Sequence, residues 1–212
     1  MLLGPPASGK GVQADRLKAR FGIPSASPGA MMREEKRKGT ALGIEADRIT
    51  RDGSMVPDSM VITLVREWLK AHTGKFLFDG FPRDIEQAVA LEEILKERGE
   101  ALDVVLFFDV PEEVVERRVL NRVTCPACGG SFGIGNDVAS ADAPCPVCGG
   151  KLIRRSDDTL QAFRHRMDQY REKTSPLIGF YRERGLLQTV GAGQAPDTVF
   201  SEIISILEAH GV

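Results

Sequence analysis

The hydrophobic and polar positions of the chain follow two alternating patterns. Short apolar runs at residues 2–3, 76–78, 104–108 and 186–190 are typical of buried β-strands. Between these runs, apolar residues recur every three or four positions, which predicts amphipathic helices. Strands that alternate with helices indicate βαβ units. We therefore expect an α/β fold with a parallel sheet covered by helices on both faces.

Several helices are predicted from their apolar stripes and capping residues. Asp58 is expected to be the N-cap of one helix, and Ser27 with Pro28 is a good N-cap and first-turn pair for another. The stripes are Val61, Leu64, Val65, Trp68 and Leu69, then Leu91, Ile94 and Leu95, then Val199, Ile203, Ile204 and Leu207.

Two stretches interrupt the alternation of strands and helices. Residues 27–56 are charged and helical in pattern, with no strong strand. Residues 121–158 are rich in Gly, Cys, Pro and small residues and have little helical periodicity. We interpret both as insertions, which leaves residues 1–26, 57–120 and 159–212 as the core.

The segment Gly4-Pro5-Pro6-Ala7-Ser8-Gly9-Lys10-Gly11 follows an apolar strand and opens a helix, which is the context of a phosphate-binding P-loop. Its glycines let successive backbone N–H groups point at phosphate oxygens, and the helix N-terminus and Lys10 add positive charge. The alternative is a glycine-rich turn with no ligand. Gly11 stands where a P-loop usually has the hydroxyl that binds magnesium, so the metal must be held elsewhere.

Four cysteines form two Cys-x-x-Cys pairs separated by sixteen residues, and each pair is followed by Gly-Gly, which permits a tight turn. This spacing is typical of two knuckles that close a structural zinc site on Cys125, Cys128, Cys145 and Cys148. Two redox-active pairs are the alternative. A zinc ribbon that binds nucleic acid is disfavoured, because Phe132 is the only aromatic residue between the outer cysteines and no Lys or Arg lies there.

Composition and charge are those of an ordinary globular protein. Of the 212 residues 42% are hydrophobic and 27% are charged, and the net charge is −2. This charge gives no electrostatic indication of a nucleic-acid partner, and no apolar run approaches the ~18 residues of a membrane span. The first residues lack the basic and apolar regions of a secretory signal. We expect a cytoplasmic monomer with no membrane partner, in which cysteines bind metal rather than form disulfides.

Further motifs relate the whole chain to a known family. Asp79-Gly80-Phe81-Pro82-Arg83 follows an apolar strand, and Gln87 comes soon after it. These residues resemble motifs of the adenylate kinase family, and so does a P-loop with Gly after Lys. The resemblance extends from end to end of the chain, with further matches at Phe108-Asp109-Val110-Pro111, Arg155-Ser156-Asp157-Asp158 and Pro176-Leu177-Ile178. The resemblance implies a P-loop kinase with a nucleoside-monophosphate-binding insertion at 27–56 and a lid at 121–158, and some family members hold the lid with zinc.

The resemblance implies reversible transfer of the γ-phosphoryl group of ATP to AMP, giving two ADP, with Mg²⁺ and without a covalent intermediate. Catalysis of this kind is mainly positioning and charge neutralisation in a dry site, for which arginine is well suited. Each arginine taken alone is more often a solvated surface residue. By analogy with the family, the catalytic residues are Lys10, Asp79, Arg83, Arg122, Arg155 and Arg166.

The same analogy assigns the nucleotide contacts. Asp79 would bind magnesium through water; the alternative is a turn residue at a strand end. Gln87 would hydrogen-bond to the AMP adenine through its amide; the alternative is an exposed helix glutamine. The ATP site would comprise Ala7, Ser8, Gly9, Lys10, Gly11, Val12, Arg118, Arg122, Ser131, Phe132 and Gln194. The AMP site would comprise Pro28, Arg33, Ser54, Met55, Val56, Gly80, Phe81, Pro82, Arg83, Gln87, Arg155 and Arg166.

Four residues depart from the family pattern inside the expected site. Ala7 replaces a P-loop glycine and Val12 replaces a threonine. Pro28 stands where the family has a threonine that contacts AMP, and Ala30 stands where it has an aspartate that supports magnesium through water. A kinase with another monophosphate acceptor or an altered donor, or a nucleotide-binding sensor with low turnover, therefore remains an alternative.

Overall fold

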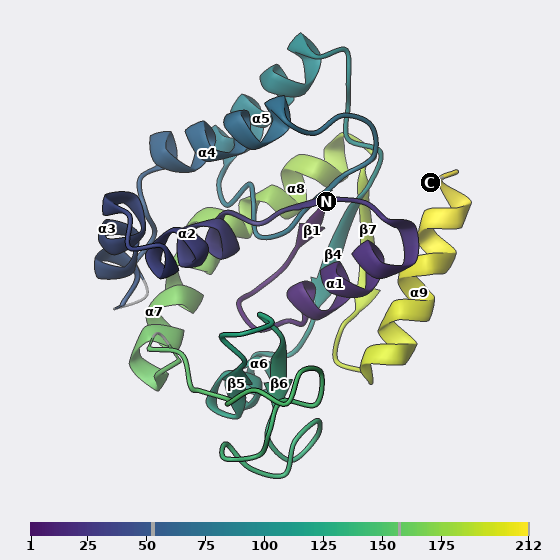
Figure 1. Ribbon diagram of the computed structural model, residues 1–212. Helices are drawn as coiled ribbons and strands as arrows, with labels where there is room; N and C mark the ends of the chain where they lie inside the picture. Colours follow the sequence, from purple (N-terminus) through teal and green to yellow (C-terminus); the bar gives the residue numbers. More distant parts are fainter. Residues whose placement is uncertain (52–53, 157, 212) are drawn as a thin grey trace.

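The computed structural model describes residues 1–51, 54–156 and 158–211, and a parallel sheet forms its centre (Figure 1). One sheet has the order β1-β4-β7, and a parallel pair, β2-β3, adjoins it through a bridge between Leu2 and Asp79. The strand order across this surface is therefore β2-β3-β1-β4-β7. The strands are β1 (Leu2–Leu3), β2 (Ser25–Ala26), β3 (Leu77–Phe78), β4 (Val105–Asp109) and β7 (Leu187–Gly191).

Helices cover both faces of this sheet, as the alternation predicts. Leu3, Phe78 and Val105 pack on one face with α4 (Asp58–Lys70), α5 (Ile85–Glu97) and α8 (Pro176–Glu183). Their neighbours in sequence, Leu2, Leu77 and Leu106, pack on the other face with α1 (Lys10–Phe21), α6 (Glu112–Leu120), α7 (Leu160–Gln169) and α9 (Pro196–Ala209). Successive strand residues point to opposite faces, so each strand contributes to both cores. None of the helices in the described residues is both long and apolar enough to span a membrane.

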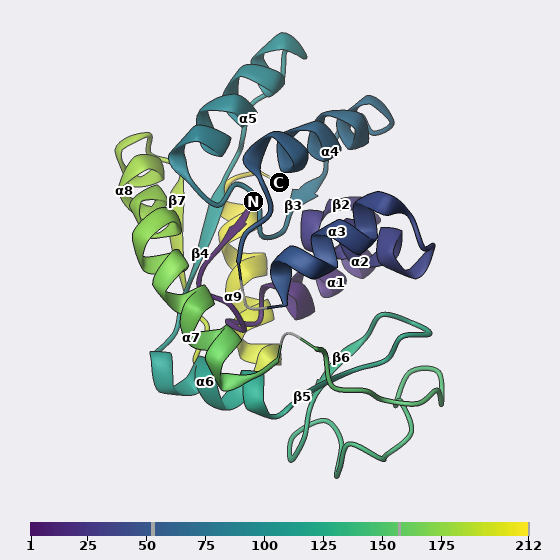
Figure 2. The same cartoon turned by 90° about the vertical axis from the view of Figure 1, so that its left-hand side faces the viewer.

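The two predicted insertions have the expected kinds of structure. Residues 27–56 contain α2 (Pro28–Arg37), which has Ser27 as its N-cap, and α3 (Ala41–Thr50). Residues 121–158 contain the antiparallel pair β5 (Arg122–Thr124) and β6 (Ser131–Gly133). This second segment extends away from the sheet (Figure 2) and buries a small core of its own: Val123, Cys125, Val138, Cys145 and Leu152. The boundaries of the insertions stay predictions.

Three details of the sequence interpretation need correction. The N-cap of α4 is Pro57, and Asp58 is the first helical residue, whose carboxylate accepts a hydrogen bond from the Gln87 side chain. Strand β2 was not predicted, because Ser25–Ala26 lacks the apolar run by which the equally short β1 and β3 were found. Strands β3, β4 and β7 each begin one residue later than their apolar runs, since the first apolar residue of each run precedes the paired backbone.

The helices α2 and α3 pack closely because a glycine lies where they cross. A Cβ atom added to Gly43 would lie 2.0 Å from the backbone nitrogen of Lys36. By contrast, a Cβ atom added to Gly179 in α8 would meet no atom within 4 Å. The same substitution at these two helical glycines should therefore have opposite effects.

We expect Gly43→Ala to lower the free energy of unfolding by about 1–3 kcal/mol, because the added methyl group forces α2 and α3 apart. Gly179→Ala is the matched control and should raise it by roughly 0.5–1 kcal/mol, because alanine is the better helix former. Urea denaturation followed by circular dichroism measures both values. A Gly43→Ala protein as stable as the unmodified chain would contradict the close crossing.

Candidate functional site

The predicted P-loop connects β1 to α1, and its lysine closes the loop on itself. The Lys10 ammonium group donates hydrogen bonds to the carbonyl oxygens of Gly4 and Pro5, both at 2.7 Å, and to Ser8 Oγ at 3.1 Å. Burial lowers the pKa of Lys10 to about 8, although the Asp79 carboxylate opposes this shift. The ammonium group therefore lies inside the turn that would hold phosphate, with neutral partners that phosphate oxygens can replace.

Ala7 occupies an unfavourable backbone conformation in this loop. Its φ is +60°, and among the described residues it is the only non-glycine with positive φ. A residue with a Cβ atom adopts the left-handed conformation at a cost of roughly 1–2 kcal/mol. The rest of the loop therefore imposes the shape that the missing glycine would adopt freely.

Asp79 lies beside the P-loop, at the end of β3. Burial raises the pKa of its carboxyl group, and the nearby positive charges of Lys10, Arg83 and Arg33 oppose this rise. A Cβ atom on Gly11 would lie 3.8 Å from Asp79 Oδ2. Gly11 thus lies next to the carboxylate and places no side chain beside it.

The backbone and side chain of Arg83 are held by several hydrogen bonds. Its backbone N–H donates to Gln87 Oε1 at 2.9 Å, and its Nε donates to the Gly80 carbonyl at 3.0 Å. Burial lowers the pKa of Arg83, the Asp79 carboxylate raises it, and the positive charge of Arg155 lowers it further. The electrostatic contacts thus bring Lys10, Asp79, Arg83 and Arg155 into one neighbourhood.

Gln87 is a buried residue, not the exposed helix glutamine of the alternative interpretation. Its Nε2 donates to Asp58 Oδ1 at 2.5 Å, while its Oε1 accepts from the Arg83 backbone. Both ends of the amide are therefore bonded to the protein. Its contact with the AMP adenine stays a prediction that requires one of these bonds to be exchanged.

Asp158 is the charged residue of this site to which the sequence analysis gave no role. Its carboxylate is fully buried and accepts two hydrogen bonds from Arg122, with 2.8 Å between Arg122 Nε and Asp158 Oδ2. Arg166 Nη2 lies 3.6 Å from Asp158 Oδ1. One carboxylate thus joins strand β5 of the 121–158 segment to helix α7. The preceding Asp157 lies outside the described residues.

Arg118 connects the P-loop to the loop after β7. Its Nη1 donates to the carbonyl oxygens of Ser8, at 3.3 Å, and Ala192, at 3.0 Å, and burial lowers the pKa of its guanidinium group. Gln194 lies in the same loop, and its exposed side chain bonds only to the Gly191 carbonyl at 3.3 Å in the described contacts. This arrangement would let the predicted backbone contact of residue 194 with ATP occur next to Arg118.

The other predicted site residues lie on several elements around this neighbourhood. Ser131 and Phe132 are on β6, where Phe132 packs against the core of the 121–158 segment. Val12 is in α1 and is 38% exposed. Pro28 and Arg33 are in α2, and Ser54 Oγ lies 3.5 Å from His165 Nε2. Met55 and Val56 precede α4, and Phe81 and Pro82, joined by a cis peptide bond, precede Arg83.

The four cysteines converge at the tip of the 121–158 segment. Their sulfur atoms all lie within 4.8 Å of one another, with 3.5 Å between Cys125 and Cys148 and 3.6 Å between Cys128 and Cys145. A tetrahedral zinc site with Zn–S bonds of about 2.3 Å has sulfur atoms roughly 3.8 Å apart. The group could therefore hold a tetrahedral metal ion, whereas two independent redox pairs would not require this convergence.

The Gly-Gly pairs form the turns that the sequence predicts. Gly129 and Gly149 have φ of +76° and +72°, and the backbone amides of Gly130 and Gly150 hydrogen-bond to Cys128 and Cys148. The backbone N–H of Cys128 is the main cause that lowers the pKa of the Cys125 thiol to about 7. These amides favour thiolate, the form of cysteine that binds metal. They oppose burial and the neighbouring cysteine side chains, which raise the pKa of Cys128 and raise that of Cys148 to about 12.

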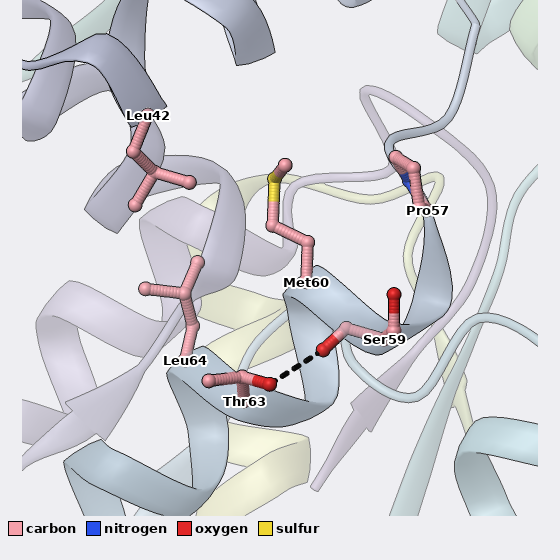
Figure 3. Close-up of a pocket in the computed structure, with 6 residues that line it drawn as sticks. All are labelled: Leu42, Pro57, Ser59, Met60, Thr63 and Leu64. Atoms are coloured by element: carbon pink, nitrogen blue, oxygen red, sulfur yellow. Dashed lines mark hydrogen bonds between the residues drawn. The ribbon is translucent and has the colours of Figure 1, made fainter.

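A separate cavity of about 350 Å³ lies between α3 and the start of α4 (Figure 3). Its lining residues carry no charged side chain, so it is not suited to phosphate. They are Leu42, Pro57, Ser59, Met60, Thr63 and Leu64.

Comparison with known proteins gives one consistent result. A family model described as adenylate kinase matches residues 2–186. The adenylate kinase of Clostridium botulinum (strain Eklund 17B / Type B) is 40% identical over 209 residues, which is 98% of this chain and 97% of that protein. The adenylate kinases of Methanosarcina acetivorans and Archaeoglobus fulgidus are each 41% identical, again over 98% of this chain and 97% of theirs.

Proposed function

The chain belongs to the adenylate kinase family, and we propose how its own residues perform the reversible transfer of the ATP γ-phosphoryl group to AMP, which gives two ADP. The observation that carries the proposal is the gathering of positive charge near the P-loop. Lys10, Arg83 and Arg33 act on the Asp79 carboxylate, Arg122 acts on Lys10, and Arg155 acts on Arg83. Positive charge gathered at one site suits two nucleotides whose phosphates must approach each other.

The donor ATP binds with its phosphates in the P-loop. Lys10 exchanges its neutral partners, the Gly4 and Pro5 carbonyls and Ser8 Oγ, for phosphate oxygens, which form stronger charge-assisted bonds. The adenine lies near Arg118 and Gln194, whose loop is already joined to the P-loop by the Arg118 hydrogen bonds. Ala7, Ser8, Gly9, Gly11 and Val12 complete the phosphate side, and Ser131 and Phe132 contact ATP from the lid.

The acceptor AMP binds between α2 and the loop before α5. Arg33 and Arg83 hold its phosphate, and Gln87 contacts its adenine after exchanging a protein partner. Burial raises the pKa of Asp79, and both Arg33, in α2, and Arg83 oppose this rise. This supports the placement, because it indicates that α2 and Arg83 lie near the same carboxylate. The remaining contacts come from Pro28, Ser54, Met55, Val56, Gly80, Phe81 and Pro82.

The lid brings the remaining arginines to the phosphates when it closes. Arg122 and Arg166 share the buried Asp158, which fixes their guanidinium groups before nucleotide binds. Together with Arg155 they neutralise charge on the transferring group, and the closed lid excludes water that would hydrolyse ATP. The reaction requires no covalent intermediate and no dedicated general base.

Two metals belong to this proposal. Asp79 would hold hydrated Mg²⁺, and Mg²⁺ would supply neutralisation of the β- and γ-phosphate charge. Gly11 places no side chain beside this carboxylate. A zinc ion on Cys125, Cys128, Cys145 and Cys148 stabilises the lid. Four protein thiolates fill its coordination sphere, so this zinc is structural rather than catalytic.

We also propose that the chain is a cytoplasmic monomer. Analytical ultracentrifugation tests the proposed oligomeric state.

We expect AMP to exceed CMP, UMP and GMP in kcat/KM by at least ~100-fold, because a site that hydrogen-bonds one base leaves polar groups unpaired with another. A coupled assay with ATP and each monophosphate measures these values. Equal use of GMP or UMP would indicate another acceptor, and negligible turnover would indicate a nucleotide sensor.

Arg83→Lys should raise KM for AMP, since lysine cannot bind phosphate bidentately. Arg20→Lys, on the exposed side of α1, is the control.

For the lid, we expect about one zinc per chain in the purified protein. Cys145→Ser should lower the zinc content and the melting temperature of the lid, because metal-binding energy contributes to folding. The sheet should still form, since its strands lie outside the lid. Ala139→Ser, at an exposed position between the knuckles, is the matched control. Unchanged zinc content and melting temperature in Cys145→Ser would rule out the zinc site.

For magnesium, we expect an active enzyme that needs more Mg²⁺ than relatives with an aspartate at the position of Ala30. Ala30→Asp should increase the rate at limiting Mg²⁺, because outer-shell contacts typically change metal affinity or activity by roughly 10–100-fold. Asp79→Ala should remove most activity. Ala41→Asp, in the first turn of the neighbouring α3, is the control. Initial rates against free Mg²⁺ test this, and an unchanged response in Ala30→Asp would show that the chain holds its metal differently.

A further inference from the structure

We propose that Thr174 is a positioning residue for the acceptor nucleotide, acting through the backbone of Arg83. The inference rests on the proposed function, because it takes the Arg83 loop as part of the AMP site. Thr174 needs no contact with either nucleotide to act in this way.

The hydrogen bond between these residues is short, partly buried and long-range. Thr174 Oγ1 donates to the Arg83 carbonyl oxygen at 2.6 Å, across 91 positions of sequence. Thr174 is only 6% exposed. The bond therefore joins the helical segment before α8 to the loop between β3 and α5. Without the hydroxyl group, the Arg83 carbonyl would lose this partner in a partly buried place.

With this bond, side chains from two different elements hold the Arg83 backbone. Thr174 binds its carbonyl oxygen, and Gln87 Oε1 accepts from its N–H at 2.9 Å. The next residue, Asp84, is the N-cap of α5 and accepts from the Gln87 backbone N–H at 2.8 Å. Arg83 thus starts from a fixed backbone, which limits the directions that its guanidinium group can take.

Thr174 reaches Arg83 from a wide helical turn. Residues Tyr170–Thr174 form a π-helical turn, η1, in which the Ser175 N–H donates to the Tyr170 carbonyl at 2.7 Å. Pro176 begins α8 directly afterwards, and its lack of an N–H costs no helical hydrogen bond at that position. Isolated π-turns are rare and occur frequently at functional sites.

The wide turn lies where the helical segment passes from one core to the other. Before it, Phe163 and Met167 of α7 pack in the core with α1 and α9. After it, Leu177 and Tyr181 of α8 pack in the core with α4 and α5. Figure 2 shows α7 and α8 following each other along one side of the strands. Thr174 occupies the change of face, which is where a side chain can reach the loop that follows β3.

The test compares Thr174→Val, which keeps the side-chain shape and removes the hydroxyl, with Thr174→Ser, which keeps the hydroxyl. We expect Thr174→Val to raise KM and the calorimetric Kd for AMP by about 3- to 10-fold, the effect of one lost hydrogen bond. The values for ATP should stay within about twofold. Thr174→Ser should restore AMP binding to within about twofold of the unmodified enzyme. Thr174→Ala supplies the same loss of hydroxyl if Thr174→Val does not fold.

Ser175→Ala is the matched control, because the neighbouring hydroxyl bonds only to the Arg171 carbonyl of its own helical segment in the described contacts. It should leave both nucleotides unaffected. Unchanged AMP binding in Thr174→Val, an equal loss for AMP and ATP, or failure of Thr174→Ser to restore AMP binding would each overturn the proposal. The unmodified enzyme is assayed first with AMP, so that failure of the proposed function is seen separately.

Discussion

Repulsion between cations at one edge of the sheet is the constraint on which the rest of the site depends. Arg83 and Arg122 lie close enough to Lys10 to lower its pKa, and Arg155 has the same effect on Arg83. Two carboxylates offset this repulsion: Asp79 lies near Lys10, Arg83 and Arg33, and the buried Asp158 pairs with Arg122 and Arg166. Nucleotide phosphates supply the additional negative charge that such a site attracts. The two aspartates therefore offset the repulsion between these cations and stabilise the folded chain before substrate binds.

The fold was largely predictable because its determinants are local. Short apolar runs and helical stripes give the strands, the helices and the coverage of both faces, and the P-loop and cysteine motifs are contiguous or regularly spaced. Strand β2 was missed because Ser25–Ala26 is not an apolar run. Asp58 was misplaced by one position because a carboxylate just inside a helix resembles an N-cap in sequence, although here its partner is the Gln87 side chain.

The finer structure of the site was less predictable because it depends on contacts distant in sequence. Asp158 meets Arg122 across 36 positions, and Thr174 meets Arg83 across 91. Nothing in the local pattern around either residue distinguishes it from a surface aspartate or a helix threonine. The hydrogen bond from the Gln87 amide was equally hard to predict, since its partner Asp58 belongs to another helix. Only the packing of α4, α5 and the α7–α8 segment brings these groups together.

The separate core of the 121–158 segment, the proposed lid, bears on how nucleotide binding energy would be used. Ordering one residue of backbone costs roughly 1–2 kcal/mol of conformational entropy. A lid that folded only around ATP would subtract that cost from the affinity for ATP. Val123, Val138 and Leu152 pack with two cysteines in a core formed by residues of the 121–158 segment alone. The proposed lid would therefore move as a preorganised body, and most of the free energy of its contact with ATP would remain available to align the reacting phosphates.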